Sequence, residues 1–170
     1  MNVLLVAGML LIAGGHKRIH HDDLDFAAAA IVDACDGQGP ALPPHGIECY
    51  AAIVAIWYTE TRGSFAGYSQ PVAEHTGVGP MQVLQPRTPL GYWNSSLGHP
   101  SQRWIAPPPA TLRMPAVNFR WGVRVLRMKY AKAGRRQRWL RTFRFYNGSP
   151  RGPQYALMAK WAFRMVQRER

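Results

Sequence analysis

The chain of 170 residues has a formal net charge of +12, and apolar residues make up 47% of it. That apolar content is enough for the packed core of one domain, which argues against intrinsic disorder, and no internal repeat indicates a solenoid or a fibre. The charge is unevenly placed, because residues 1–60 contain two basic and seven acidic residues whereas residues 61–170 contain 19 basic and two acidic ones. The basic part favours a polyanionic partner: nucleic acid, an anionic cell wall or anionic lipid.

The N-terminal segment is apolar over residues 3–13 and is followed by the basic cluster His16-Lys17-Arg18. This run is shorter than the ~20 apolar residues that a membrane-spanning helix needs. It has the length of a signal-peptide core, with residues 13–15 as a candidate cleavage site, but no basic residue precedes it. A packing helix, a short membrane anchor and a segment held by a partner are the other interpretations. We therefore separate an N-terminal segment, residues 1–21, from a main domain, residues 22–170.

Two cysteines, Cys35 and Cys49, flank a loop rich in Gly and Pro. In an oxidising compartment they would form a disulfide that closes a loop of about 15 residues and contributes ~3 kcal/mol. The alternative is a pair of buried thiols on adjacent helices. Two thiols without further ligands at metal-site spacing do not indicate zinc, and we expect no metal or cofactor.

The first predicted helix covers residues 24–34, with Asp22 or Asp23 as its N-cap. The strongest helix covers residues 47–61, and Gly63 ends it. Its apolar residues recur at i, i+3, i+4 and i+7 and are Ile47, Tyr50, Ala51, Val54, Trp57 and Tyr58.

The middle of the chain predicts irregular structure. Residues 64–79 form a Gly-rich loop, residues 80–84 favour one or two helical turns, and residues 86–115 contain seven prolines. Further helices are predicted at 115–131, at 137–146 and from Ser149-Pro150 to about residue 167. Tyr155, Met158, Ala162 and Met165 should line one face of the last one. No stretch alternates with period two for long, so the predicted fold is mainly α with a long Pro-rich loop in the middle.

Glu60 is the first candidate for chemistry. It ends the helix whose preceding residues include Ile56, Trp57 and Tyr58. Apolar neighbours disfavour the charged form of a carboxyl group and raise its pKa, as a general acid near neutral pH requires. The alternative is a partly exposed glutamate at a helix C-terminus.

Short motifs follow Glu60 in a definite order. They are E-T-R-G-S-F from Glu60, then Ser69, G-V-G-P-M-Q with Met81 and Gln82, Asn118 with Trp121-Gly122, F-Y-N-G with Tyr146 and Asn147, and Tyr155. This set resembles the soluble lytic transglycosylases, which are lysozyme-like, and less closely the goose-type lysozymes, over residues 42–166. The sequence departs from the family pattern where Thr61 stands for Ser, where Pro80 stands for Leu, and in the length of its Pro-rich segment.

The resemblance implies a lysozyme-like helical fold and cleavage of peptidoglycan between N-acetylmuramic acid and N-acetylglucosamine. Glu60 would protonate the glycosidic oxygen and then accept the proton of the muramoyl 6-hydroxyl. Met81 and Gln82 would line the substrate site, and Tyr146 would orient the acid or the substrate. Asn147, Ser69 and Tyr155 would contribute further contacts to the same site. Each of these residues also has a plain structural interpretation: core packing for Met81 and Tyr155, and a turn for Asn147.

Carboxylates are scarce beyond Glu60, where the sequence contains Glu74 and the near-terminal Glu169. Most glycosidases use two carboxylates that flank the scissile bond. A site with Glu60 alone predicts substrate assistance by the 2-acetamido group and a 1,6-anhydro product. If Glu74 positions a water molecule instead, a hydrolysing goose-type muramidase is expected.

Two functions of other classes stay open at this point. The basic helices, with Arg135-Arg136-Gln137-Arg138-Trp139, also fit nucleic-acid binding, and a lysozyme-like module can serve as a structural part of a virion or a secretion channel. The wall substrate places the enzyme either in a phage virion or in the bacterial periplasm and envelope. The order of the motifs around Glu60 favours the enzyme.

Overall fold

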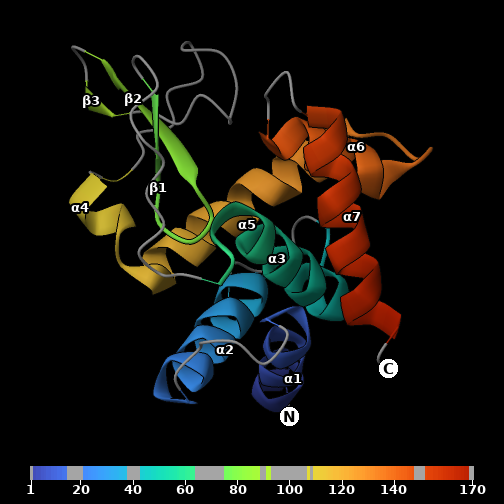
Figure 1. Ribbon diagram of the computed structural model, residues 1–170. Coiled ribbons are helices and arrows are strands. Elements are labelled where there is room, and N and C mark those ends of the chain that lie inside the picture. Colours follow the sequence, from blue (N-terminus) through green and yellow to red (C-terminus); the bar gives the residue numbers. More distant parts are fainter. Residues whose placement is uncertain are drawn as a thin grey trace.

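The computed structural model describes residues 2–14, 21–37, 43–63, 75–88, 91–92, 107, 109–147 and 152–168. Within these ranges the protein is mainly helical, which confirms the predicted fold class (Figure 1). The helices of the described residues are α1 (Asn2–Gly14), α2 (His21–Asp36), α3 (Gly46–Thr61), α4 (Pro109–Leu112), α5 (Pro115–Lys132), α6 (Arg138–Asn147) and α7 (Gly152–Arg168). The strands are β1 (His75–Val78), β2 (Val83–Thr88) and β3 (Gly91–Tyr92).

Helix α3 forms the centre of the molecule and packs against α1, α2, α5 and α7 (Figure 1). Every residue from Cys49 to Trp57 is buried. A helix that is apolar on all sides is a core helix rather than an amphipathic surface helix. The boundaries predicted for this helix are confirmed, but the single apolar face is wrong, because Ile47 is 39% exposed and the residues between the predicted positions are buried as well.

The N-terminal segment is a helix that packs on the domain. Helix α1 contacts α2, α3 and α7, and it buries Val6, Ala7, Met9 and Leu10. Among the described residues no helix combines the length and the apolar character that crossing a bilayer would require. Helix α2 begins at His21, so Asp22 and Asp23 belong to its first turn, and the predicted N-cap is wrong.

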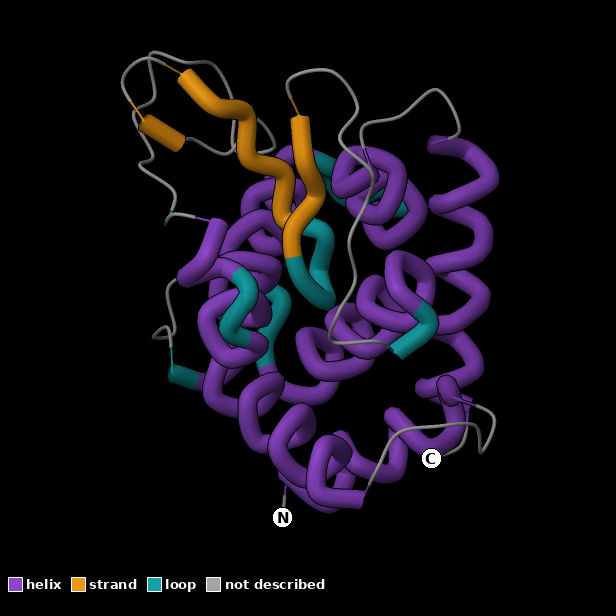
Figure 2. The backbone as a smooth tube through the Cα atoms, turned by 60° about the vertical axis from the view of Figure 1, so that its left-hand side comes forward, coloured by secondary structure: helices purple, strands orange, loops and turns teal. Residues whose placement is uncertain are grey.

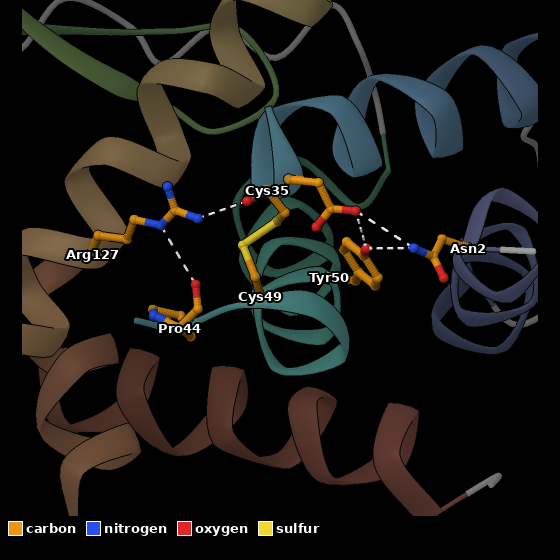
Figure 3. Close-up of a disulfide and its surroundings, with 7 residues drawn as sticks. Asn2, Cys35, Pro44, Cys49, Tyr50 and Arg127 are labelled. Atoms are coloured by element: carbon orange, nitrogen blue, oxygen red, sulfur yellow. Dashed lines mark hydrogen bonds between the residues drawn. A yellow bond between two sulfur atoms is a disulfide. The ribbon is translucent and has the colours of Figure 1, made fainter. Parts of the chain in front are cut away.

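The start of α3 is tied to its neighbours by covalent and polar contacts (Figure 3). Cys35 at the end of α2 and Cys49 near the start of α3 form a disulfide, which settles the alternative between a bond and two thiols. Buried Arg127 of α5 donates to the carbonyl oxygens of Cys35, at 2.6 Å, and Pro44, at 3.5 Å. Because a buried guanidinium needs acceptors, these two bonds fix α5 against the end of α2 and against the segment that precedes α3.

The three C-terminal helices confirm the sequence prediction closely. Helices α5, α6 and α7 begin and end within a few residues of the predicted limits. Trp139 of α6 lies against Phe163 of α7, with ring centroids 4.6 Å apart. The predicted inner face of α7 is right for Tyr155 and Ala162 but wrong for Met158, which is 59% exposed. The side chain of Met165 lies outside the described part.

A small antiparallel sheet replaces part of the predicted loop (Figure 2). Strands β1 and β2 pair with Val78 opposite Val83, and β3 pairs with the end of β2. The helical turns predicted for residues 80–84 are therefore wrong, because residues 79–82 form the turn of this hairpin and β2 begins at Val83. Strands this short, one containing Gly and the next Pro, show too little alternation to be recognised in the sequence. Most of the Pro-rich segment lies outside the described residues.

Candidate active site

The last turn of α3 carries Glu60 to the point where the helix ends. Arg62 adopts a left-handed conformation with φ 54°, and its backbone N–H donates to the carbonyl oxygen of Tyr58 at 2.9 Å. Gly63 follows with φ 81°, which glycine adopts without steric cost. The predicted helix stop at Gly63 is confirmed, and the chain leaves the helix after Thr61, one residue beyond Glu60.

Glu60 is partly buried, and Tyr155 of α7 lies against its carboxyl group. The Tyr155 hydroxyl donates a hydrogen bond to Glu60 Oε1 at 2.9 Å. Burial raises the pKa of Glu60 to about 7, while the bond from Tyr155 opposes part of this rise because it stabilises the charged form. A carboxyl group with this pKa is protonated in a substantial fraction of molecules at neutral pH, so it can both donate and accept a proton.

Tyr146 of α6 lies within electrostatic reach of Glu60 and bonds to the β1–β2 turn. It is buried, and its hydroxyl donates to the carbonyl oxygen of Met81 at 3.0 Å. Burial, together with the negative charge of Glu60, raises the pKa of Tyr146 well above its ordinary value of 10. The same two causes raise the pKa of Tyr155. Both phenols therefore stay neutral, and each donates one hydrogen bond: Tyr155 to the Glu60 carboxyl group and Tyr146 to the Met81 carbonyl oxygen.

Asn118 of α5 fastens the turn that carries Met81. Its Nδ2 donates to the carbonyl oxygens of Val78, at 2.8 Å, and Leu112, at 2.9 Å, and its Oδ1 accepts from the Met81 backbone N–H at 2.8 Å. The side chain is completely buried, so these bonds satisfy polar groups that water cannot reach. Figure 2 shows the turn between β1 and β2 reaching in among the helices.

Glycine is required at two positions by the closeness of this packing. A Cβ at Gly122 would lie 2.6 Å from Cγ of Met81, and one at Gly79 would lie 2.5 Å from Nδ2 of Asn118. Gly79 also has φ 71°, which a side chain would strain. Asn118 and Gly122 lie four residues apart on one face of α5. Asn118 bonds to the turn between β1 and β2, and Gly122 leaves room for Met81 of the same turn. The sequence pointed to this pair as a motif but not to its contact with Met81.

The predicted site residues are brought together in part. Tyr155 with Glu60 and Tyr146 with Met81 form two hydrogen-bonded pairs. The two pairs lie within electrostatic reach of each other, because Glu60 affects the pKa of Tyr146. Gln82 follows Met81 with φ 46°, and its amide nitrogen donates to the carbonyl oxygen of Gly79 at 2.8 Å, within the same turn. Met81 is fully buried, as its structural interpretation anticipated.

Three predicted site residues cannot be placed in this group. Ser69 and Glu74 lie outside the described residues. Asn147 is the last residue of α6, but its side chain lies outside the described part. In the part of the chain that the structure describes, no three His, Cys, Asp or Glu side chains gather as ligands for a metal ion.

Comparisons with models of protein families, with curated proteins and with solved structures found no match for this chain. The structure is mainly helical, and its functional features are the contacts of Glu60, Tyr155, Tyr146 and Met81.

Proposed function

We propose that the chain is a lytic transglycosylase with a lysozyme-like fold, which cleaves the β-1,4 bond between N-acetylmuramic acid and N-acetylglucosamine in peptidoglycan. The observation that carries the proposal is the partly buried carboxyl group of Glu60, whose pKa is raised to about 7. It lies at the end of a core helix and accepts a hydrogen bond from Tyr155. The order of motifs from Glu60 to Tyr155, which resembles that of the soluble lytic transglycosylases, supports the same conclusion.

The reaction needs one group that donates and then accepts a proton. Protonated Glu60 donates its proton to the glycosidic oxygen while the bond from that oxygen to C1 of the muramoyl residue breaks. The 2-acetamido group of the substrate stabilises the positive charge that develops at C1. The Glu60 carboxylate then accepts the proton of the muramoyl 6-hydroxyl, whose oxygen forms the new bond to C1. The products are a 1,6-anhydromuramoyl end and a 4-hydroxyl of N-acetylglucosamine, and Glu60 is again protonated.

Several neighbours have proposed supporting roles. Tyr155 orients the carboxyl group of Glu60, and Tyr146 holds the Met81 turn in place through its bond to the Met81 carbonyl oxygen. Gln82, Ser69 and Asn147 are the proposed contacts for sugar hydroxyl and acetamido groups. Hydrolysis with Glu74 as a second carboxylate is the rival reaction at the same site.

The disulfide supports a location outside the cytoplasm. Such bonds persist in oxidising compartments, among them the bacterial periplasm, and are rare in the reducing cytoplasm. The Cys35–Cys49 bond therefore favours an enzyme of the periplasm or cell envelope over a virion protein that is assembled in the cytoplasm.

Digestion of purified peptidoglycan, followed by mass analysis of the soluble fragments, tests the proposal. We expect the wild type to release 1,6-anhydromuramoyl ends and Glu60→Gln to lose ~10²–10⁴-fold in rate, because Gln cannot exchange the proton. Glu48→Gln is the matched control, since Glu48 is an exposed acid in the first turn of the same helix.

Two results would reject the transglycosylase. Reducing muramoyl ends from the wild type would identify a hydrolase and direct attention to Glu74. An inactive wild type that binds DNA with a strong dependence on salt would favour the nucleic-acid function.

A further inference from the structure

The outward face of α7 combines exposed apolar and basic side chains. Leu157, Met158 and Trp161 are 61%, 59% and 63% exposed. Leu157 and Trp161 are four residues apart, so they lie next to each other on the helix, and Met158 flanks them. These three residues, which we name the α7 apolar patch, lie opposite the side that Tyr155, Ala159, Ala162, Phe163 and Val166 bury against the core.

Basic residues border the α7 apolar patch. Arg164 is exposed and follows Trp161 by one helical turn, and Lys160 is partly exposed and lies four residues before Arg164. No acidic residue occurs in the sequence between 75 and 168, so no carboxylate of α4 to α7 can offset these charges. The salt bridge between Arg120 and Asp33 joins α5 to α2 and does not involve α7. The part of the chain from α4 to α7 therefore contributes only positive charge around the patch.

We propose that this face of α7 docks the protein on an anionic lipid surface. A helix with Trp and Leu beside Lys and Arg has the composition of helices that lie in the interface of a bilayer, where the apolar side chains enter the acyl boundary and the cations meet the headgroups. The charge of the neighbouring helices complements anionic headgroups, which is the reason to favour lipid over an uncharged protein partner. Figure 1 shows α7 along the outer side of the molecule, away from the sheet.

The docking is independent of the proposed glycan cleavage. The α7 apolar patch lies on the outer side of α7, whereas Tyr155, which contacts Glu60, lies on the inner side. Docking would hold the enzyme beside the membrane that borders its substrate, but vesicle binding needs no glycan. A failure of one proposal thus leaves the other untouched.

Flotation of the full chain with vesicles is the test. We expect binding to vesicles of phosphatidylcholine mixed with phosphatidylglycerol, weaker binding to pure phosphatidylcholine, and a decrease with added salt. The double variant Leu157→Ser with Trp161→Ser should bind the anionic vesicles at least about tenfold more weakly, since it removes two large apolar side chains from the interface. Met114→Ser, which removes an apolar side chain that is 57% exposed at the start of α5, is the control and should bind as the wild type does.

Two double variants, each of which removes two positive charges, test how much charge contributes to vesicle binding. Lys160→Gln with Arg164→Gln should weaken binding more than Arg135→Gln with Arg136→Gln, which removes two exposed charges between α5 and α6. Trp161→Phe should bind nearly normally but lose most of the quenching of tryptophan fluorescence by brominated lipid, which places Trp161 in the bilayer. The Leu157 and Trp161 double variant should digest purified peptidoglycan at the rate of the wild type.

Three outcomes would overturn the docking. One is anionic vesicle binding that survives the Leu157 and Trp161 double variant. The second is a dimer in sedimentation that this variant dissociates, because a second copy would then cover the patch. The third is binding of duplex DNA, but not of vesicles, that the α7 variants abolish.

Discussion

The two ends of α3 each place a tyrosine hydroxyl against a carboxylate, and the two pairs differ in their surroundings. At the start of the helix, Tyr50 donates to Asp36, and Asn2 donates to the same Asp36 oxygen and to the Tyr50 hydroxyl (Figure 3). At the end of the helix, Tyr155 donates to Glu60. Asp36 is exposed at the end of α2, whereas Glu60 is largely covered by protein.

The comparison shows that the setting decides what such a pair does. Asp36 meets water and lies within the electrostatic reach of Arg127, so its hydrogen bonds serve to hold α1, α2 and α3 together. Glu60 is affected by burial and by Tyr155, and burial has the larger effect on its pKa. We infer that one end of α3 is built for stability and the other for proton transfer.

The largest expected loss of stability comes from the β1–β2 turn, which Asn118 holds near the Glu60 end of α3. Asn118→Ala removes three buried hydrogen bonds, to two backbone carbonyl oxygens and one backbone N–H. We expect it to lower the free energy of unfolding by on the order of 4 kcal/mol. Asn2→Ala, at the exposed contacts of the other end, should cost less than about 1 kcal/mol. Denaturant unfolding of both variants measures the difference, and equal losses would contradict the proposed role of Asn118.

The second largest effect is expected from removal of the Cys35–Cys49 disulfide at the start of α3. Cys35→Ser with Cys49→Ser opens a loop of about 15 residues and should lower the free energy of unfolding by about 3 kcal/mol. Because Glu60 lies at the opposite end of the helix, its titration should be unchanged in this variant. A shift of the Glu60 pKa would show that the two ends are coupled.

Removing the buried charge should stabilise the protein, in a manner that depends on pH. The folded-state pKa of Glu60, about 7, lies above its unfolded value of 4.5, so the wild type loses stability as the pH rises from 4.5 through 7. Glu60→Gln should therefore be more stable than the wild type by about 2 to 3 kcal/mol at pH 8, and this advantage should vanish below about pH 4.5. Unfolding in denaturant at the two pH values measures it; a gain at low pH alone would reverse the sign and contradict the assignment.

The smallest effect concerns the hydroxyl that contacts Glu60. Tyr155→Phe removes a bond that favours the charged carboxylate, so the pKa of Glu60 should rise further and the alkaline limb of the activity profile should move to higher pH. The cost in the free energy of unfolding should be about 1 kcal/mol. Tyr50→Phe, the same substitution at the other end, should leave the profile in place. A shift to lower pH in Tyr155→Phe would contradict the described geometry.

The sequence predicted those features that depend on helical periodicity and on helix-ending residues. For α3 the helical spacing of apolar residues and the stop at Gly63 predict the helix, and for α7 the Ser149-Pro150 start and the apolar face predict it. Glu60 was singled out because apolar and aromatic residues precede it in its own helix. The disulfide stayed open because sequence spacing alone does not show whether two cysteines approach each other.

The remaining features depend on contacts between distant residues. The turn between β1 and β2 docks on α5 through Asn118, and no local sequence pattern indicates that contact. The outward position of Met158 and the burial of α3 on all sides from Cys49 to Trp57 depend on which helices surround them, and composition does not reveal this. The raised pKa of Glu60 was expected in direction from its neighbours in α3, but its bond to Tyr155, 95 residues away, needed the fold.

The central claim is that burial makes Glu60 a proton donor near neutral pH. The carboxyl group can be titrated directly by following the side-chain carbon of ¹³C-labelled glutamate by NMR, with Glu60→Gln assigning the signal and Glu48 as an exposed reference in the same helix. The structure predicts a midpoint at about pH 7 for Glu60. A midpoint near 4.5, the ordinary value for a glutamate, would contradict the account.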